Sequence, residues 1–167
     1  MAIKVAVLMG SDSDLGIMEN TFKALKEFKI RFDVKVLSAH RTPHQVVRYI
    51  KAAEKKGVKV FIAGAGGAAH LAGVVASHTV LPVIGVPIDA TPLKGLDALL
   101  ATCQMPPGVP VATVAVGKMG AYNAGLLAVQ CLAIADRKLA RALVQYKKTM
   151  VSTVVAKDKK VQKTIKK

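Results

Sequence analysis

The sequence contains no tryptophan, few other aromatic residues and only two cysteines, and each scarcity excludes a class of protein. Aromatic residues make up 4% of the 167 residues, which argues against a nucleic-acid reader that stacks bases on aromatic side chains. Cys103 and Cys131 lie far apart and form no CxxC pair, so we expect neither a disulfide framework nor a thiolate metal site. We interpret both as small core residues of a protein in a reducing cytosol.

Acidic residues are scarce too. The chain has 10 Asp and Glu residues and 25 Lys and Arg residues, which gives a net charge of +15. The excess is uneven, since residues 147–167 hold eight lysines and one aspartate. Such a Lys-rich tail attracts nucleic acid or anionic membranes in some proteins. A solvated chain end is the commoner case, so we expect a helical extension or a partly disordered segment here, and no nucleic-acid partner.

Charge is missing altogether from residues 60–88, a run long enough to span a bilayer. The run is interrupted by five glycines, two prolines and two histidines, which would leave backbone groups unsatisfied in lipid. Two buried strands around a short helix explain it better. We expect no membrane partner, and the first residues do not have the pattern of a signal peptide.

β-Branched apolar runs alternate with amphipathic segments along the chain. We predict strands over residues 3–9, 32–37, 58–63, 83–86 and 111–116, with helices over 14–29, 43–56, about ten residues after 64–67, 93–103, 121–135 and 137–146. This alternation predicts one α/β domain over residues 1–146, with a five-stranded parallel sheet covered on both faces. Ligands of such sheets bind beyond the carboxyl ends of the strands.

The second half of this domain has few charges. Residues 61–117 carry one basic and two acidic side chains, and residues 119–135 carry none. Because a small monomer must expose much of its surface, we expect another copy of the chain to cover part of this half, as in a homo-oligomer.

The loop after the first predicted strand reads Gly10-Ser11-Asp12-Ser13-Asp14. Small residues at a helix N-terminus suit a phosphate, which Ser11 or Ser13 would bind. One of the aspartates would instead hold ribose hydroxyls. Taken alone, the loop favours a plain helix cap made by Ser13 or Asp14.

The loop after the second strand contains His40 and Arg41 within Ser38–Pro43. Histidine titrates near neutral pH, and arginine binds phosphate or carboxylate through its planar fork. Their position at the ligand-binding edge favours an acid-base histidine beside an anion-binding arginine over an ordinary polar loop. His44 follows His40 at helical spacing, but Pro43 starts the helix between them, so we expect no metal site.

The loop after the third strand, Gly64-Ala65-Gly66-Gly67-Ala68-Ala69-His70, is rich in glycine. It imitates a dinucleotide fingerprint, and Asp89 ends the next strand where an acid would hold a ribose, so an NAD-binding oxidoreductase is an alternative. The pattern is degenerate and lies on the third strand instead of the first. His70 is either a second polar contact for a ligand or a histidine satisfied within the fold. Asn123, at the start of the helix after the fifth strand, would bind a polar ligand or cap that helix.

Six segments occur together in a specific order: Gly10–Asp14, Ser38–Pro43, Ala63–Leu71, Pro82–Pro87, Gln104–Pro106 and Gly117–Ala124. In this set the chain resembles the 5-(carboxyamino)imidazole ribonucleotide mutases of purine biosynthesis over about residues 3–146. The resemblance implies a catalytic domain with a flavodoxin-like three-layer fold, assembled as a cytoplasmic homo-octamer. It also implies an isomerase that binds a ribonucleotide, needs no metal or organic cofactor, and moves a carboxylate from the exocyclic nitrogen to ring carbon 4.

The resemblance also implies roles for individual residues. His40 would be the acid-base catalyst, and the substrate would be bound by Ser11, Asp14, Ser38, Arg41, Gly66, Gly67 and His70, with Arg41 near the phosphate. Ala72 departs from the proline usual in bacterial mutases, and the Lys-rich tail has no clear counterpart. Direct carboxylation of aminoimidazole ribonucleotide by carbon dioxide is the alternative reaction, and a non-catalytic nucleotide-binding protein is a more distant one.

Overall fold

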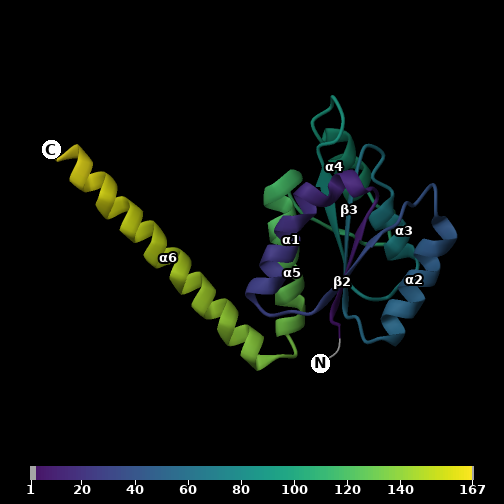
Figure 1. Cartoon of the computed structure of the whole chain (residues 1–167), viewed down its shortest axis with the longest axis horizontal. Coiled ribbons are helices and arrows are strands. Elements are labelled where there is room, and N and C mark those ends of the chain that lie inside the picture. Colours follow the sequence, from purple (N-terminus) through teal and green to yellow (C-terminus); the bar gives the residue numbers. More distant parts are fainter. Residues whose placement is uncertain (1–2, 167) are drawn as a thin grey trace.

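Five parallel strands form one sheet in the order β2-β1-β3-β4-β5 (Figure 1). The computed structural model describes residues 3–166. The strands are β1 (Val5–Met9), β2 (Phe32–Val36), β3 (Val60–Gly66), β4 (Val83–Ile88) and β5 (Ala112–Thr113). This order is flavodoxin-like, and its direction reverses at β1, so the crevice for ligands lies where the loops after β1, β2 and β3 meet.

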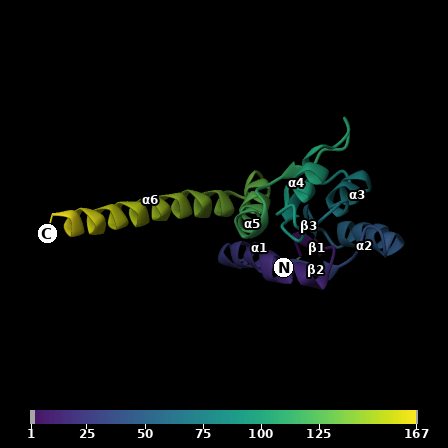
Figure 2. The same ribbon diagram turned by 90° about the horizontal axis from the view of Figure 1, so that it is seen from above.

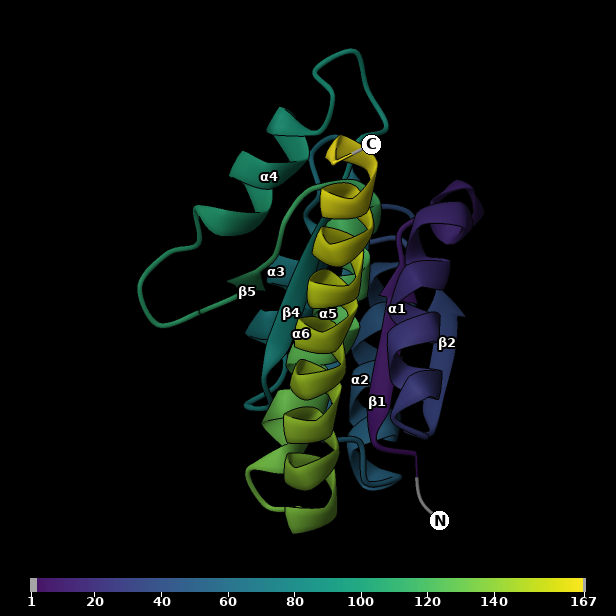
Figure 3. The same ribbon diagram turned by 90° about the vertical axis from the view of Figure 1, so that its left-hand side faces the viewer.

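Helices cover both faces of the sheet, as Figure 2 shows. They are α1 (Leu15–Glu27), α2 (Pro43–Lys55), α3 (Leu71–Ser77), α4 (Leu96–Cys103), α5 (Gly117–Ala133) and α6 (Arg137–Ile165), with a 3₁₀ turn η1 (Asp12–Asp14) before α1. Helices α1 and α5 lie side by side on one face (Figure 3). Helices α2 and α3 cover the other face, and α4 packs there against β4 and β5.

The strands are apolar on both sides because both faces are covered. In β1, Val5 and Val7 pack toward α1 and α5, whereas Ala6 and Leu8 pack toward α2 and α3. All four side chains are fully buried. The predicted parallel α/β fold is therefore confirmed, with one apolar core on each side of the sheet.

Several boundaries differ from the predicted ones. The fifth strand has two residues, Ala112–Thr113, and lies at the edge of the sheet, where it pairs with β4. Helix α5 begins at Gly117, four residues before the predicted start, and Gly117 turns the chain into it with φ +72°. Helix α3 has seven residues instead of about ten, and Ala72 lies buried in its first turn.

The cysteine prediction is wrong for Cys103, which is exposed. It is the last residue of α4, and its thiol points back to the carbonyl oxygen of Leu100 in the same helix. Cys131 is half-buried in α5, and burial raises the pKa of its thiol.

Helix α6 projects away from the sheet and its covering helices (Figures 1 and 2). Asp136 caps its N-terminus by accepting hydrogen bonds from the backbone amides of Lys138 and Leu139. Leu139 and Leu143 pack against the core, and Tyr146 packs edge-on against Phe28 of the body. From Lys147 to Lys166 every residue is exposed. No helix within residues 3–166 combines the length and apolarity needed to cross a membrane.

Candidate active site

A cavity of about 470 Å³ opens at the carboxyl edge of the sheet. It brings together the three loops expected to carry chemistry and one residue after β4. Its lining residues are Gly10, Ser11, Ser13, Asp14, Ser38, Ala39, His40, Arg41, Ala65, Gly66, Ala69, His70, Leu71 and Ala90. Seven of the eight predicted site residues are among them. Gly67 adjoins the cavity in sequence, and within the described chain neither it nor Asn123 belongs to the lining.

Ser11 caps the turn after β1. Its hydroxyl accepts a hydrogen bond from the backbone amide of Ser13 at 3.3 Å, and the Asp14 carboxylate accepts one from the backbone amide of Ser11 at 3.0 Å. This reciprocal arrangement is a capping box. The sequence favoured Ser13 or Asp14 as the cap. Asp14 is the N-cap residue of α1, but its side chain makes no capping hydrogen bond to that helix, because a 3₁₀ turn precedes α1 and Ser11 makes the side-chain cap of that turn.

Asp14 is a buried acid, with 4% of its surface exposed. Burial raises the pKa of its carboxyl group, and hydrogen bonds from the backbone amides of Ser11 and Gly10 partly offset this. Its contact with the Ser11 amide fixes the loop that forms one wall of the cavity.

Arg41 joins the loops after β1 and β2. Its Nη2 atom donates to the carbonyl oxygen of Gly10 at 3.3 Å, and its backbone amide donates to the hydroxyl of Ser38 at 3.2 Å. The amide of Ser38 in turn donates to the hydroxyl of Thr42 at 2.9 Å. The guanidinium is thereby held at the exposed rim of the cavity, where a phosphate or carboxylate can reach it.

His40 and His70 meet across the cavity. Nε2 of His40 and Nδ1 of His70 are 2.7 Å apart in a hydrogen bond, and the rings cross edge to face at 74°. The two residues follow β2 and β3, which flank β1 in the sheet. The sequence indicated each histidine as a candidate site residue. It did not predict their contact, because that contact depends on the order of the strands in the sheet. Two imidazoles in contact can hold and transfer a proton at one place.

The glycine-rich loop brings its backbone close to its neighbours. A Cβ atom on Gly66 would lie 2.6 Å from Cβ of Ala90, so the site requires glycine. Gly67 has φ +60° and Ala69 has φ +43°, so the chain makes a tight left-handed turn before His70. Asp89 lies beside Gly117 instead of lining this cavity, so the acid that a dinucleotide site would need here is elsewhere.

Sequence reasoning also missed the apolar part of the lining. Leu71 and Ala90 contribute walls without any polar atom in their side chains. The place of Ala90 in the loop after the fourth strand indicated that it lies at this edge of the sheet, but its contact with Gly66 depends on the pairing of β3 with β4. The cavity therefore combines a histidine pair, an anion-binding rim and a small apolar wall.

Comparisons with known proteins agree on one family. The family profile described as AIR carboxylase matches residues 4–153. An N5-carboxyaminoimidazole ribonucleotide mutase from Mycobacterium leprae is 52% identical over 96% of this chain and 92% of its own length. One from Saccharolobus solfataricus is 53% identical over 92% and 96%, and one from Bacillus subtilis is 50% identical over 90% and 93%. A crystal structure of a PurE2 variant from Treponema denticola superposes with a TM-score of 0.87 at 29% identity, covering 96% of this chain and 98% of that one.

Proposed function

The chain belongs to the AIR carboxylase family, and we propose that the cavity holding His40 and Arg41 is its active site. The activity is that of an N5-carboxyaminoimidazole ribonucleotide mutase, an isomerase of purine biosynthesis. The observation that supports the site most directly is the position of His40 in a cavity whose rim carries Arg41. A proton donor and an anion-binding group are what a carboxylate transfer within a nucleotide requires.

His40 carries the proton in this proposal. As an imidazolium it protonates the exocyclic nitrogen while the bond to the carboxylate breaks, which leaves aminoimidazole ribonucleotide, carbon dioxide and a neutral His40. Ring carbon 4 then adds to carbon dioxide, and His40 removes the proton from that carbon. The enzyme returns to its starting state with no net proton taken up. A cavity that keeps carbon dioxide beside the ring gives the second step a high effective concentration.

The other cavity residues bind the nucleotide. Arg41 is assigned to the phosphate, because its guanidinium lies at the exposed rim and is tied to Gly10. Ser11, Asp14 and Ser38 are assigned to polar groups of the nucleotide on the same side. The backbone of the loop with Gly66, Gly67 and His70 is assigned to the base and carboxylate, since a glycine backbone allows close approach.

A substrate-choice assay tests the reaction. We expect purified protein to convert 5-(carboxyamino)imidazole ribonucleotide to the 4-carboxylated product without added bicarbonate. Aminoimidazole ribonucleotide with bicarbonate should react far more slowly at the same protein concentration. Efficient use of the second substrate alone would indicate the direct carboxylase, and turnover of neither would leave a nucleotide-binding protein on this fold.

We place the enzyme in the cytoplasm, as a homo-octamer. The free thiols of Cys103 and Cys131 suit a reducing compartment. Assembly is supported by apolar side chains that the single chain leaves exposed. Leu93, Leu96, Leu100 and Met119 are exposed in the charge-poor half, and apolar exposure on this scale is typical of subunit interfaces.

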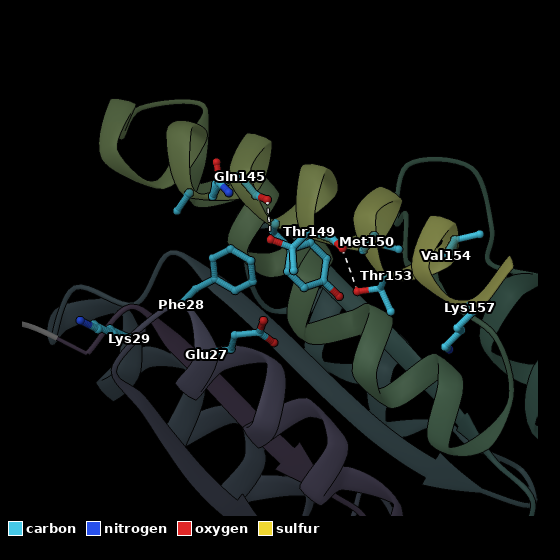
Figure 4. A pocket seen from close by; sticks show the side chains of 11 residues that line it. Glu27, Phe28, Lys29, Gln145, Thr149, Met150, Thr153, Val154 and Lys157 are labelled. Atoms are coloured by element: carbon cyan, nitrogen blue, oxygen red, sulfur yellow. Dashed lines mark hydrogen bonds between the residues drawn. The ribbon is translucent and has the colours of Figure 1, made fainter. Parts of the chain in front are cut away.

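Helix α6 adds a second exposed apolar surface. Met150, Val154, Val161 and Ile165 follow each other at intervals of 4, 7 and 4 residues and are each more than half exposed. They continue the stripe with which Leu139 and Leu143 pack on the body. A groove of about 770 Å³ separates α6 from the end of α1 near Phe28 (Figure 4). We assign this stripe and groove to a neighbouring copy of the chain.

Substitutions on α6 test the assembly. We expect the triple change Met150→Ser, Val154→Ser and Val161→Ser to lower the mass measured by light scattering, because it removes apolar contact area between copies. The control triple, Ser152→Ala, Lys159→Ala and Lys163→Ala, lies on the opposite face at 100° per residue and should keep the wild-type mass. A wild-type mass of one chain would remove the octamer, and equal masses of both variants would remove α6 from the interface.

A further inference from the structure

We propose that His70 is a positioning residue that determines which nitrogen of His40 exchanges the proton with substrate. The proposal rests on the acid-base role assigned to His40 above. It goes further by giving Nδ1 of His40 the proton transfer, and by giving His70 a role that acts through His40.

The hydrogen bond itself restricts the protonation states. The contact joins Nε2 of His40 to Nδ1 of His70 at 2.7 Å, and only one of the two atoms can carry the hydrogen between them. When His40 is the acid, both of its ring nitrogens carry a hydrogen. Nδ1 of His70 must then accept, so His70 is neutral with its own proton on Nε2.

The same bond persists after His40 gives up its other proton. Nε2–H of His40 remains directed at His70, and Nδ1 of His40 is left with a free lone pair. That nitrogen is therefore the base that removes the ring proton in the second step. His70 thus holds one tautomer of His40 through the cycle, as the partner of a catalytic imidazole does in other enzymes.

The backbone around His70 is fixed from both sides. Ala69 and Leu71 are buried, with 4% and 2% of their surfaces exposed. Ala69 has φ +43°, and its amide donates to the carbonyl oxygen of Gly66 at 3.2 Å. The carbonyl oxygen of His70 accepts from the amide of Val74 in the first turn of α3 at 2.9 Å. A side chain mounted on such a backbone suits a positioning role.

The charged side chains that line the cavity form their hydrogen bonds with groups other than the two histidines. Asp14 accepts from the Ser11 amide, and Arg41 donates to Gly10 and Ser38. Over residues 3–166, each imidazole has the other as its only hydrogen-bond partner. The tautomers of His40 and His70 are therefore set by the hydrogen bond between the two side chains.

Two substitutions of His70 distinguish positioning from substrate contact. Leucine removes the acceptor, whereas the amide oxygen of asparagine lies near the place of Nδ1. We expect His70→Leu to lower kcat by about 10- to 100-fold, by analogy with the loss of hydrogen-bond partners of metal-binding imidazoles, with KM within about twofold of wild type. His70→Asn should recover most of that loss. A raised KM with unchanged kcat in both variants would make His70 a substrate contact and overturn the proposal.

A spectroscopic measurement reports the tautomer directly. In protein labelled with ¹⁵N-histidine, and without substrate, neutral His40 should carry its proton on Nε2 in wild type and in His70→Asn. In His70→Leu we expect a mixture of both tautomers, and an unchanged tautomer there would also overturn the proposal. Failure of the proposed function is separate, because full activity of a His40 variant would remove His40 as the catalyst whatever the His70 variants show.

Discussion

His40→Asn is expected to lower turnover by about 10²- to 10⁴-fold, the range for loss of a general acid-base group. Asparagine keeps a polar side chain in the cavity but neither donates nor removes a proton at this step. Substrate affinity should stay within a few-fold of wild type, since Arg41 and the loop after β1 are unaffected. Single-turnover kinetics with the carboxyamino substrate, together with a binding titration, measure both quantities.

His44→Asn is the matched control. His44 lies in the first turn of α2, four residues from His40, and is not among the residues that line the cavity. We expect wild-type turnover from it. Turnover near wild type in His40→Asn itself would eliminate His40 as the acid-base group.

Gly120→Ala is expected to lower the free energy of unfolding by about 3 kcal/mol, at the upper end of the usual cost of overpacking. A Cβ atom on Gly120 would lie 1.5 Å from the carbonyl oxygen of Ala115. That oxygen belongs to the backbone that leads into α5, so it cannot rotate away as a side chain would. The start of α5, packed against α1, would have to move.

Gly16→Ala is expected to change the free energy of unfolding in the opposite direction to Gly120→Ala. Gly16 is exposed in the first turn of α1, and a Cβ atom there meets nothing within 4 Å. Because alanine favours a helix over glycine, we expect a gain of about 0.5–1 kcal/mol. Urea unfolding of both variants at one protein concentration measures the difference. If both variants unfolded at a similar urea concentration, the backbone around Gly120 would be able to shift at little cost in free energy.

Much of the fold could be predicted because a strand that is buried on both faces of the sheet is apolar at nearly every position. The run Val5–Met9 is apolar at every position, since one side of β1 meets α1 and α5 and the other meets α2 and α3. The same reasoning located the cavity, because ligands of parallel sheets bind at the carboxyl ends of the strands. Ser11, His40 and Arg41 were nominated from their places in those loops.

What could not be predicted depends on distances between segments remote in sequence. The contact of His40 with His70 requires β2 and β3 to lie on either side of β1, and no local pattern encodes that order. The cap at Ser11 depends on a 3₁₀ turn of three residues. Helix α6 continues beyond Tyr146 to Ile165, and the sequence could not decide between such a helical extension and a partly disordered tail, because the lysines masked the apolar stripe.

The distal half of α6 lies apart from the loops that line the cavity, so substitutions can occur in one of the two regions independently of the other. From Lys147 to Lys166 the side chains are exposed and lie outside the lining of the cavity. We expect substitutions there to leave the geometry of the cavity in the same chain unchanged, and substitutions in the loops after β1, β2 and β3 to leave α6 unchanged. Under the assembly proposed above, selection can therefore tune how copies associate, and how strongly they do so, separately from the chemistry proposed for each copy.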